Sequence, residues 1–360
     1  MNEVFPESRT SLAAVFHGSG IPLELQQIPV PKPAAGEAVV RITCCTVCGS
    51  DLHTIAGKRI EPTPTIPGHE IIGTVVEIGE PAPVTVTGQL LQPGDRISWS
   101  VCVSCGTCDR CLQGLNQKCH TLQKYGHDVA TGRLALSGGL AEFMLLRMNS
   151  AVAIVDPALS DAEACPANCA TATVAAAMRL AGSVTGKRVR ITGAGMLGLT
   201  AAAMSMFRGA THVEIRDPDL SRRSRASDFC PDAAVLEPDH EAADADVVFE
   251  CSGAAAAIEK SFHSLAIGGT MVLIGSVLPG PPVSLDPERI IRRCLTIRGI
   301  HNYTPEDLQA ALDFLIRSHD RFAFDQLVER TFPLADINAA VAWAMEQQPI
   351  RVGILPGAVS

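Results

Sequence analysis

From about residue 160 onward, compact apolar runs alternate with Ala-rich stretches that are long enough to form helices. The Ala-rich stretches cover residues 171–181, 196–208 and 254–266. The apolar runs between and after them are RVRIT (188–192), HVEIR (212–216), DVVFE (246–250), TMVLIG (270–275) and LTIRG (295–299). Strands separated by helix-length segments form βαβ units and a parallel sheet. We therefore predict a doubly wound α/β domain in this part of the chain.

A glycine-rich turn, GAGMLG, directly follows the first of these strands. Its glycines have the G-x-G-x-x-G spacing, and the predicted helix begins inside the motif. In this context the glycines allow a tight turn and a close approach of the backbone to a pyrophosphate, which meets the helix N-terminus. The sequence thus predicts a dinucleotide site built from Gly193, Gly195, Met196, Leu197 and Gly198.

A carboxylate at the end of the next strand bears on which dinucleotide binds. Asp217 lies about 20 residues after Gly198, where an acid accepts hydrogen bonds from the adenosine ribose hydroxyls. This position favours NAD over NADP, because a carboxylate repels a 2′-phosphate. Arg222 and Arg223 lie close by and argue in the other direction.

The first 155 residues have a different sequence pattern, with many Gly and Pro residues and short β-branched runs. Examples are VVRIT (39–43), EIIGTVVEIG (70–79) and GDRISW (94–99), each bounded by turn residues. Such runs predict short antiparallel strands. Near the end of the chain we predict two helices, at about 304–318 and 334–346, and a final strand, IRVGIL. The predicted layout is a β-rich domain, an inserted α/β domain and a C-terminal return to the first.

Four cysteines form a C-x2-C-x2-C-x7-C cluster: Cys105, Cys108, Cys111 and Cys119. Four thiolates so close in sequence suit a closed tetrahedral shell around a structural zinc ion. Cys102 extends the run by one more x2 step, and such runs also occur in iron–sulfur proteins. The run lacks the Cys-Pro ending of ferredoxins, so zinc is the preferred interpretation.

A second group of candidate ligands is spread over three segments, CCTVCGSDLH (44–53), PGHE (67–70) and CPANCATAT (165–173). A catalytic zinc ion takes three protein ligands and keeps one position open. Cys48 and His69 are natural candidates, and either Cys165 or Cys169 could supply the third ligand.

The order of these motifs resembles that of zinc-dependent alcohol dehydrogenases of the medium-chain dehydrogenase/reductase superfamily. The resemblance runs from CGSDLH (48–53) through GHE (68–70), Gly73, Gly79 and the four-cysteine cluster to GAGMLG, and covers essentially the whole chain. It implies a GroES-like catalytic domain, a Rossmann domain and a cleft between them for zinc and the nicotinamide. We expect these domains at residues 1–165 (with the zinc lobe at about 102–120), 166–299 and 300–360, the last returning to the catalytic domain.

By position, the resemblance implies Cys48, His69 and Cys169 as the catalytic zinc ligands, because Cys169 fits the family's Cys-Ala step. Glu70 matches an acid that lies beneath the zinc ion, and Asp51 resembles the carboxylate that orients the histidine ligand.

Three further residues are implied to act on the substrate proton or the cofactor. Ser50 and His53 stand at the offsets of the family's proton relay, and Arg351 in PIRVGIL resembles a pyrophosphate-binding arginine. The implied reaction is oxidation of an alcohol on zinc, with hydride transfer to the nicotinamide ring.

A narrower resemblance connects the chain to a subgroup associated with phosphonate catabolism. It rests on the run from residue 46 to 73, on KYGH (124–127), SGGLAEF (137–143) and CPANCATATVAAAM. The substrate would then be a small hydroxyalkylphosphonate, and the other substrate that we expect is a polyol. An anionic substrate needs cationic or amide partners, and the candidates are Lys58, Arg59, Lys124 and His127. Of these, we expect Arg59 and His127 to contact the substrate. Alternatively, Lys58 and Arg59 merely solvate a loop.

Composition narrows the class of protein and its surroundings. Lys plus Arg total 29 against 38 Asp plus Glu, a net charge of −9, and aromatic residues make up 4%, which disfavours nucleic-acid binding. No apolar stretch is long enough to span a bilayer, and the start, MNEVFPESRT, does not read as a secretory signal. Thirteen cysteines without an export signal indicate reduced thiols, so we expect a cytoplasmic protein.

The leading hypothesis is therefore a zinc- and NAD-dependent alcohol dehydrogenase with two zinc ions per chain, acting on a small alcohol or aldehyde. The family resemblance also implies a homodimer or homotetramer. Two alternatives stay open: a zinc-independent, NADPH-dependent quinone or enone reductase of the same fold, and a non-catalytic zinc-binding scaffold protein.

Overall fold

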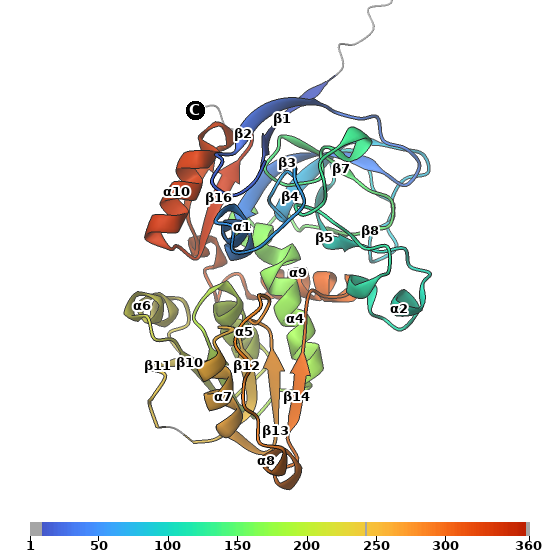
Figure 1. Ribbon diagram of the computed structural model, residues 1–360. Coiled ribbons are helices and arrows are strands. Elements are labelled where there is room, and N and C mark those ends of the chain that lie inside the picture. The colour runs from blue at the N-terminus through green and yellow to red at the C-terminus, as the bar shows by residue number, and fades with distance from the viewer. Residues whose placement is uncertain (1–8, 242, 358–360) are drawn as a thin grey trace, which may run out of the picture. The chain divides into compact units, whose positions relative to one another are not determined.

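The computed structural model describes residues 9–241 and 243–357, and the chain divides into two compact units (Figure 1). Unit 1 combines the chain up to Cys169 with the chain from Phe324 onward, and unit 2 is Ala170–Ala323. Most of the N-terminal segment expected to lack a secretory signal, residues 1–8, lies outside the described residues.

The second domain boundary differs from the expected one. The return to the first unit begins at Phe324 rather than at residue 300. The cause is helix α9 (Pro305–Ser318), which packs against α4 (Ala170–Ala181) within unit 2. Arg179 of α4 donates two hydrogen bonds, of 2.9 and 2.7 Å, to the carboxylate of Asp307 in α9 and ties the two helices together.

Unit 1 is built on β-strands, as predicted. Its strands are β1 (Thr10–Val15), β2 (Glu24–Pro29), β3 (Ala38–Val47), β4 (Glu70–Ile78), β5 (Arg96–Val103), β6 (Gln123–Lys124), β7 (Phe143–Leu146), β8 (Ser150–Ile154), β15 (Val328–Pro333) and β16 (Arg351–Leu355). One sheet has the order β15-β16-β3-β4-β5-β6, with β7 on β3 and β8 on β5, and β1 pairs with β2. Strand β16 lies antiparallel to β3, so a segment near the end of the chain is joined to the middle of this sheet.

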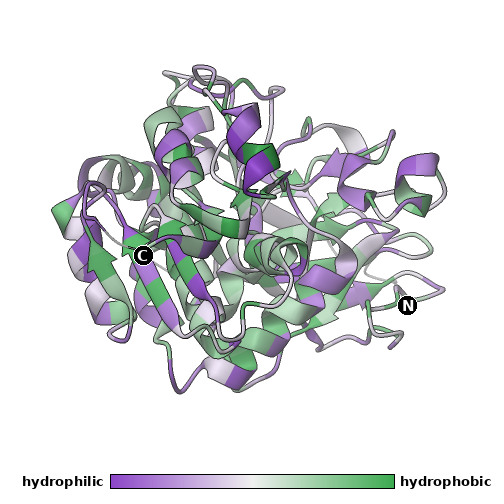
Figure 2. Cartoon of the chain, turned by 90° about the horizontal axis from the view of Figure 1, so that it is seen from below, coloured by the Kyte–Doolittle hydropathy of each residue, from purple (hydrophilic) through white to green (hydrophobic). Residues whose placement is uncertain are grey.

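The core of unit 1 forms because the strands bury most of their apolar side chains. Figure 2 shows hydrophobic and hydrophilic residues interleaved along the ribbon of the whole chain. In unit 1, most of β3, AVVRITCCTV, is buried. Trp99 and Tyr125 are fully buried and meet edge to face, with 6.3 Å between their ring centroids. The Tyr125 hydroxyl is 2.7 Å from Ser150 Oγ and accepts a 2.7 Å hydrogen bond from the Arg147 amide, so its polar end is satisfied.

Short helices connect these strands. They are α1 (Gly49–Ile55), α2 (Asp109–Leu112), α3 (Asp161–Ala164) and α10 (Ile337–Gln347), with 3-10 turns η1 (Asn116–Lys118), η2 (Gly132–Leu134), η3 (Cys165–Asn168), η4 (Phe324–Leu327) and η5 (Leu334–Asp336). Ser160 begins α3 with a capping box, because its hydroxyl accepts from the Glu163 amide while the Glu163 carboxylate accepts from the Ser160 amide.

Unit 2 contains the predicted doubly wound sheet. Its strands are β9 (Arg188–Thr192), β10 (His212–Arg216), β11 (Ala234–Leu236), β12 (Ala245–Glu250), β13 (Leu265–Leu273) and β14 (Thr296–Gly299). They pair in parallel in the order β11-β10-β9-β12-β13-β14. The connecting helices, besides α4 and α9, are α5 (Met196–Phe207), α6 (Leu220–Phe229), α7 (Ala255–His263) and α8 (Pro287–Arg292).

The strand order reverses direction between β9 and β12. In open parallel sheets, ligands bind outside the carboxyl ends of the strands at such a switch point. The GAGMLG turn follows β9 directly and therefore lies at this point. The predicted fold class, a β-rich domain plus a doubly wound parallel sheet, is confirmed. Within residues 9–241 and 243–357, no helix is long and apolar enough to cross a membrane.

Candidate metal and dinucleotide sites

Cys48, His69 and Cys169 come together in unit 1 from three separate elements. Cys48 precedes α1, His69 precedes β4, and Cys169 follows η3. One ligand atom of each lies within 4.8 Å of the others. Two sulfurs and one imidazole nitrogen in such proximity match the donor set of a zinc site that keeps an open position. The residues present therefore fit a catalytic zinc ion, and Cys169 rather than Cys165 belongs to the group.

Asp51 in the first turn of α1 fixes two members of this group. Its Oδ2 accepts a 2.9 Å hydrogen bond from the Cys48 amide, and its Oδ1 lies 3.2 Å from His69 Nδ1. Burial alone would raise the pKa of Asp51, but the adjacent imidazole of His69 lowers it, so the carboxylate is ionised. An ionised partner at Nδ1 directs Nε2 of His69 away from Asp51 and makes it the ligand atom.

Glu70 and Arg351 form a buried ion pair beside the same group. Arg351 donates hydrogen bonds of 2.7 Å from Nε and Nη2 to the two carboxylate oxygens of Glu70. Thr46 donates a further 2.6 Å hydrogen bond to Oε2, and Arg351 Nη2 lies 3.5 Å from Cys48 Sγ. The guanidinium thus neutralises the carboxylate and faces the thiol at the same time. The resemblance implied a pyrophosphate-binding role for Arg351. The structure pairs its guanidinium with Glu70, and the pyrophosphate-binding role stays a prediction.

The two thiols of this group differ in their acid–base behaviour. A hydrogen bond from the Cys169 thiol lowers the pKa of Cys48 well below its usual range, and the positive charge of Arg351 acts in the same direction. Because the pair shares one proton, the pKa of Cys169 is raised. A thiolate at Cys48 is the form that binds a metal ion.

Ser50 lies at this group, but His53 does not join it. Ser50 Oγ is 3.4 Å from His69 Nε2, next to the nitrogen that faces the metal position. His53 lies in the last turn of α1, and its side chain makes no hydrogen bond or ion pair to Ser50 among the residues that the structure describes. The relay predicted from the offsets would pass from Ser50 to His53 through a ribose hydroxyl of the cofactor, so it needs no direct contact between the two side chains and stays a prediction.

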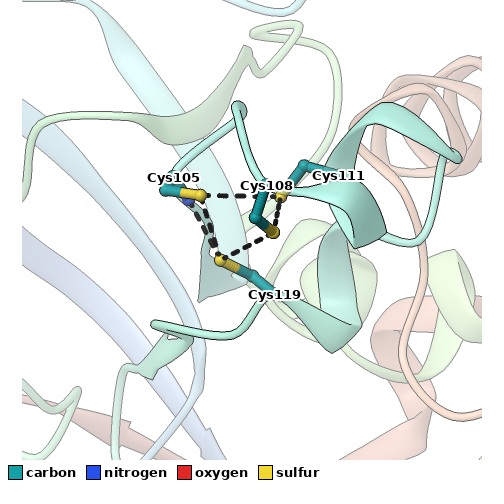
Figure 3. Close-up of side chains that lie close together, drawn as sticks. All are labelled: Cys105, Cys108, Cys111 and Cys119. Atoms are coloured by element: carbon teal, nitrogen blue, oxygen red, sulfur yellow. Dashed lines mark hydrogen bonds between the residues drawn. The ribbon is translucent and has the colours of Figure 1, made fainter.

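The four-cysteine cluster closes around a common centre, as Figure 3 shows. The sulfur of Cys119 lies 3.4 Å from that of Cys105 and 3.9 Å from that of Cys108, and the sulfur of Cys111 lies 3.5 Å from Cys108 and 4.0 Å from Cys105. Four thiols at these separations fit a tetrahedral metal ion with no open position. Cys102 lies outside this group and is buried, which raises the pKa of its thiol to about 11. A fifth ligand from Cys102, as in an extended iron–sulfur run, is not supported.

The dinucleotide motif in unit 2 leaves no room for larger residues at its third glycine. A Cβ at Gly198 would lie 1.8 Å from the Gly193 carbonyl oxygen, whereas a Cβ at Gly195 would meet no atom within 4 Å. Gly193 has a φ of 95°, in the left-handed region that favours glycine. The first and third glycines are thus required by the turn itself, and the second keeps the space above the turn open.

A cavity of about 420 Å³ opens beside this turn. Asp217 lines it, and its carboxylate accepts hydrogen bonds of 2.8 Å from the Ala194 amide and 2.9 Å from the Asp219 amide. Arg216 and Ser261 also line the cavity, and both keep a buried polar atom, Nη2 and Oγ, without a hydrogen-bond partner. Buried donors without partners indicate a polar ligand, and a nucleotide fits such a cavity.

The comparisons with known proteins agree with this geometry. Residues 34–156 match the model of the alcohol dehydrogenase GroES-like domain, and residues 197–317 match that of the zinc-binding dehydrogenase. An alcohol dehydrogenase of Moraxella sp. (strain TAE123) is 32% identical over 312 residues, which cover 84% of this chain and 87% of that protein. The chain belongs to the zinc-type medium-chain dehydrogenase/reductase family. It is thus an oxidoreductase of the alcohol or polyol dehydrogenase type.

Other members of this family are similar over comparable lengths. An L-threonine 3-dehydrogenase of Pyrococcus furiosus is 33% identical over 296 residues, 77% of this chain and 79% of that protein. The solved structure of an alcohol dehydrogenase from Thermotoga maritima has a TM-score of 0.89 at 25% identity, covering 96% of this chain and 99% of that one. A cobalt- and zinc-bound alcohol dehydrogenase from Pyrobaculum aerophilum has a TM-score of 0.81 at 26% identity, with coverages of 97% and 100%.

The predicted substrate residues have partners that the sequence did not suggest. Arg59 Nε lies 2.6 Å from Glu61 Oε1, and His127 Nδ1 lies 3.2 Å from the same oxygen. The ring of His127 also lies beside that of His69, with 5.0 Å between their centroids. Lys58 is exposed, which agrees with a solvated loop.

Sequence reasoning missed three residues that contact the metal group or its immediate neighbours, because none of them belongs to a ligand motif. They are Thr46, Glu61 and Asn168. Asn168 donates hydrogen bonds of 2.9 and 2.7 Å to the carbonyl oxygens of His69 and Trp99 and accepts one of 3.2 Å from the Ile71 amide. For Asn168, the available signal was that it is the one side-chain amide among the small residues of CPANCATAT.

Proposed function

We propose that this chain is a zinc- and NAD-dependent alcohol dehydrogenase that oxidises a small alcohol to an aldehyde or ketone. The observation that carries this proposal is the convergence of Cys48, His69 and Cys169 in one group, in which His69 is buried and the two cysteines are partly buried. Three ligands with an open position suit catalysis, whereas the closed four-cysteine cluster suits a structural ion. We therefore propose two zinc ions per chain.

When bound, zinc would supply Lewis acidity to an alcohol oxygen, and the nicotinamide would accept the hydride. The chain's own residues would prepare this chemistry. Asp51 holds His69 so that Nε2 is available, and the hydrogen bond from Cys169 together with the charge of Arg351 favours the thiolate form of Cys48. Ser50 Oγ, at 3.4 Å from His69 Nε2, is placed to accept the proton of a substrate hydroxyl.

Asp217 supports NAD as the cofactor. Its carboxylate lines the cavity beside the glycine-rich turn, where the adenosine ribose of a dinucleotide would bind. Arg222 lines the same cavity and would favour a 2′-phosphate, so the two side chains oppose each other. We give Asp217 the greater weight, because it is buried and two backbone amides hold its carboxylate in place beside the turn.

For the substrate, the surroundings of His127 support an uncharged polyol over a hydroxyalkylphosphonate. Arg59, the guanidinium proposed for an anion, lies against the carboxylate of Glu61. An anionic phosphonate would have to compete with this carboxylate for the same charge.

We also propose a cytoplasmic homodimer or homotetramer. Strand β14 is at the edge of the unit 2 sheet, and its unpaired backbone groups could join the same strand of a second copy. Light scattering coupled to gel filtration would give the mass of the assembly.

The test is a panel of primary alcohols, polyols and hydroxyalkylphosphonates offered to zinc-loaded protein with NAD or NADP, followed by the absorbance of the reduced cofactor. We expect turnover with NAD, and a weaker preference for NAD over NADP in Asp217→Ala. Turnover that survives removal of zinc and prefers NADPH with an enone would favour the zinc-independent reductase. Zinc binding with no turnover of any substrate would favour the scaffold protein.

A further inference from the structure

His127 lies against a proposed metal ligand without being one. Its ring is tilted by 35° from that of His69, with 5.0 Å between the ring centroids, and the residue is 8% exposed. Because His127 lies against the ring of His69, a small substrate bound at the metal position would be long enough to reach it. The proposed catalytic group does not use His127, so its role needs a separate explanation.

Glu61 determines which nitrogen of His127 carries the proton. Its Oε1 lies 3.2 Å from His127 Nδ1 and 2.6 Å from Arg59 Nε, and the Glu61 side chain is 11% exposed. The adjacent guanidinium favours the ionised carboxylate, which has no hydrogen to donate. The contact of Glu61 with His127 Nδ1 is an ion-pair distance and not a well-aligned hydrogen bond. A lone pair on Nδ1 would still face this negative oxygen, so electrostatics favours the tautomer with the proton on Nδ1 and the lone pair on Nε2.

The other nitrogen of His127 is left for a ligand. Nε2 makes no hydrogen bond or ion pair within the part of the chain that the structure describes. With its tautomer fixed by Glu61, this atom is a hydrogen-bond acceptor beside the metal group. Its natural partner is a group that donates a hydrogen bond and carries no negative charge.

We infer that His127 selects alcohols that carry a second hydroxyl group on the carbon next to the reacting one. This inference rests on the proposed function and narrows its substrate to vicinal diols. The second hydroxyl would donate to His127 Nε2 while the reacting hydroxyl lies next to Ser50. Glu61 acts through His127 as a positioning residue.

The experiment compares 1,2-propanediol with 1-propanol, a matched alcohol that lacks the second hydroxyl. The quantity is the ratio of their kcat/KM values with NAD, measured for the wild type, His127→Phe and Glu61→Gln. The phenylalanine ring keeps the packing on His69 but removes the acceptor. We expect the ratio to fall about ten-fold in His127→Phe, the effect of one lost hydrogen bond, and by less in Glu61→Gln, where the tautomer is free.

A purely structural role of His127 would lower kcat/KM equally for both alcohols and leave the ratio unchanged. Zinc content is measured for each variant, so that a loss of the metal ion is recognised. An unchanged ratio in His127→Phe overturns the inference. The inference is also overturned if kcat/KM in His127→Phe falls for 1-amino-2-propanol and does not fall for the diol. The group that His127 selects would then be an ammonium and not a hydroxyl.

Binding is measured separately by saturation-transfer NMR of both alcohols on the zinc-loaded protein. If the wild type turns over neither alcohol but binds the diol more tightly than 1-propanol, and His127→Phe loses this preference, the proposed function fails while the selection of a second hydroxyl group by His127 stands. If it oxidises both alcohols and the wild-type ratio shows no preference for the diol, the inference fails while the proposed function stands.

Discussion

Glu70 and Arg351 lie 281 residues apart in the sequence and meet in a buried, two-point ion pair. Glu70 is fully buried and Arg351 is 8% exposed. Each therefore depends on the other for charge compensation. The pair also fastens β16 to the start of β4, next to the proposed zinc ligands Cys48 and His69.

Removing one partner of this pair should destabilise the protein strongly. In Arg351→Met the carboxylate of Glu70 stays buried without its counter-charge, and we expect a loss of about 3–5 kcal/mol in the free energy of unfolding, measured in urea. The control is Arg292→Met, because Arg292 pairs with Glu288 on the surface of α8 with 77% of its side chain exposed. Exposed pairs contribute about 1 kcal/mol or less. Equal losses in the two variants would contradict the assignment of Arg351 as a buried structural charge.

The two cysteine groups should each hold one zinc ion. We expect two zinc atoms per chain by atomic emission, and one in either Cys48→Ala or Cys111→Ser, because each substitution removes a ligand from one group. Cys48→Ala should also abolish turnover while the protein stays folded by circular dichroism. Cys294→Ser is the control, since Cys294 is exposed and belongs to neither group. Full activity in Cys48→Ala would refute its role as a ligand.

Asp51→Asn should weaken zinc at the first group without unfolding the protein. The amide no longer provides a charged acceptor for His69 Nδ1, so the ring loses its fixed orientation. We expect zinc affinity to fall about 10–100-fold, measured by competition with a chelator. Asp95→Asn is matched to it, because Asp95 also accepts a hydrogen bond from a backbone amide in unit 1, at Gln92, but belongs to neither metal group. If Asp95→Asn has the same effect on zinc, Asp51 has no special role.

The two glycines Gly195 and Gly198 should respond differently to alanine. In Gly198→Ala the new methyl group overlaps the Gly193 carbonyl, so the turn must shift, and we expect a loss of about 1–3 kcal/mol in stability. In Gly195→Ala the methyl group meets open space and the backbone φ of −83° suits alanine, so the loss in stability should stay within about 1 kcal/mol, the cost of alanine at a helix N-cap. Calorimetric titration with NAD should nevertheless show weaker binding in Gly195→Ala, because the methyl group occupies the approach of the pyrophosphate. Undiminished NAD binding there would place the cofactor elsewhere.

The sequence was sufficient for those parts of the molecule that depend on local spacing. The GAGMLG turn, the four-cysteine cluster and the alternation of strands and helices after residue 160 all involve residues close together in the chain. The choice between Cys165 and Cys169 already required the family resemblance. In the structure, Cys165 Sγ donates to the carbonyl oxygens of Cys44 and Glu70 and is a buried packing residue.

The partners of several charges were beyond sequence reasoning, because they are set by tertiary packing. Nothing in PIRVGIL connects Arg351 with Glu70 across most of the chain, and nothing in KYGH connects His127 with Glu61. The end of the α/β unit was misplaced for a related reason. Helix α9 was predicted, but its attachment to α4 through Arg179 and Asp307 involves residues 128 positions apart.

The join between β16 and β3 has a consequence for biosynthesis. A ribosome makes the chain from its N-terminus, and domains generally fold as units as they emerge. Here the nascent first unit would carry Glu70 without a counter-ion until residue 351 had been added, after all of unit 2. The α/β unit is therefore expected to be the first part to complete its folding, although it is the second to begin.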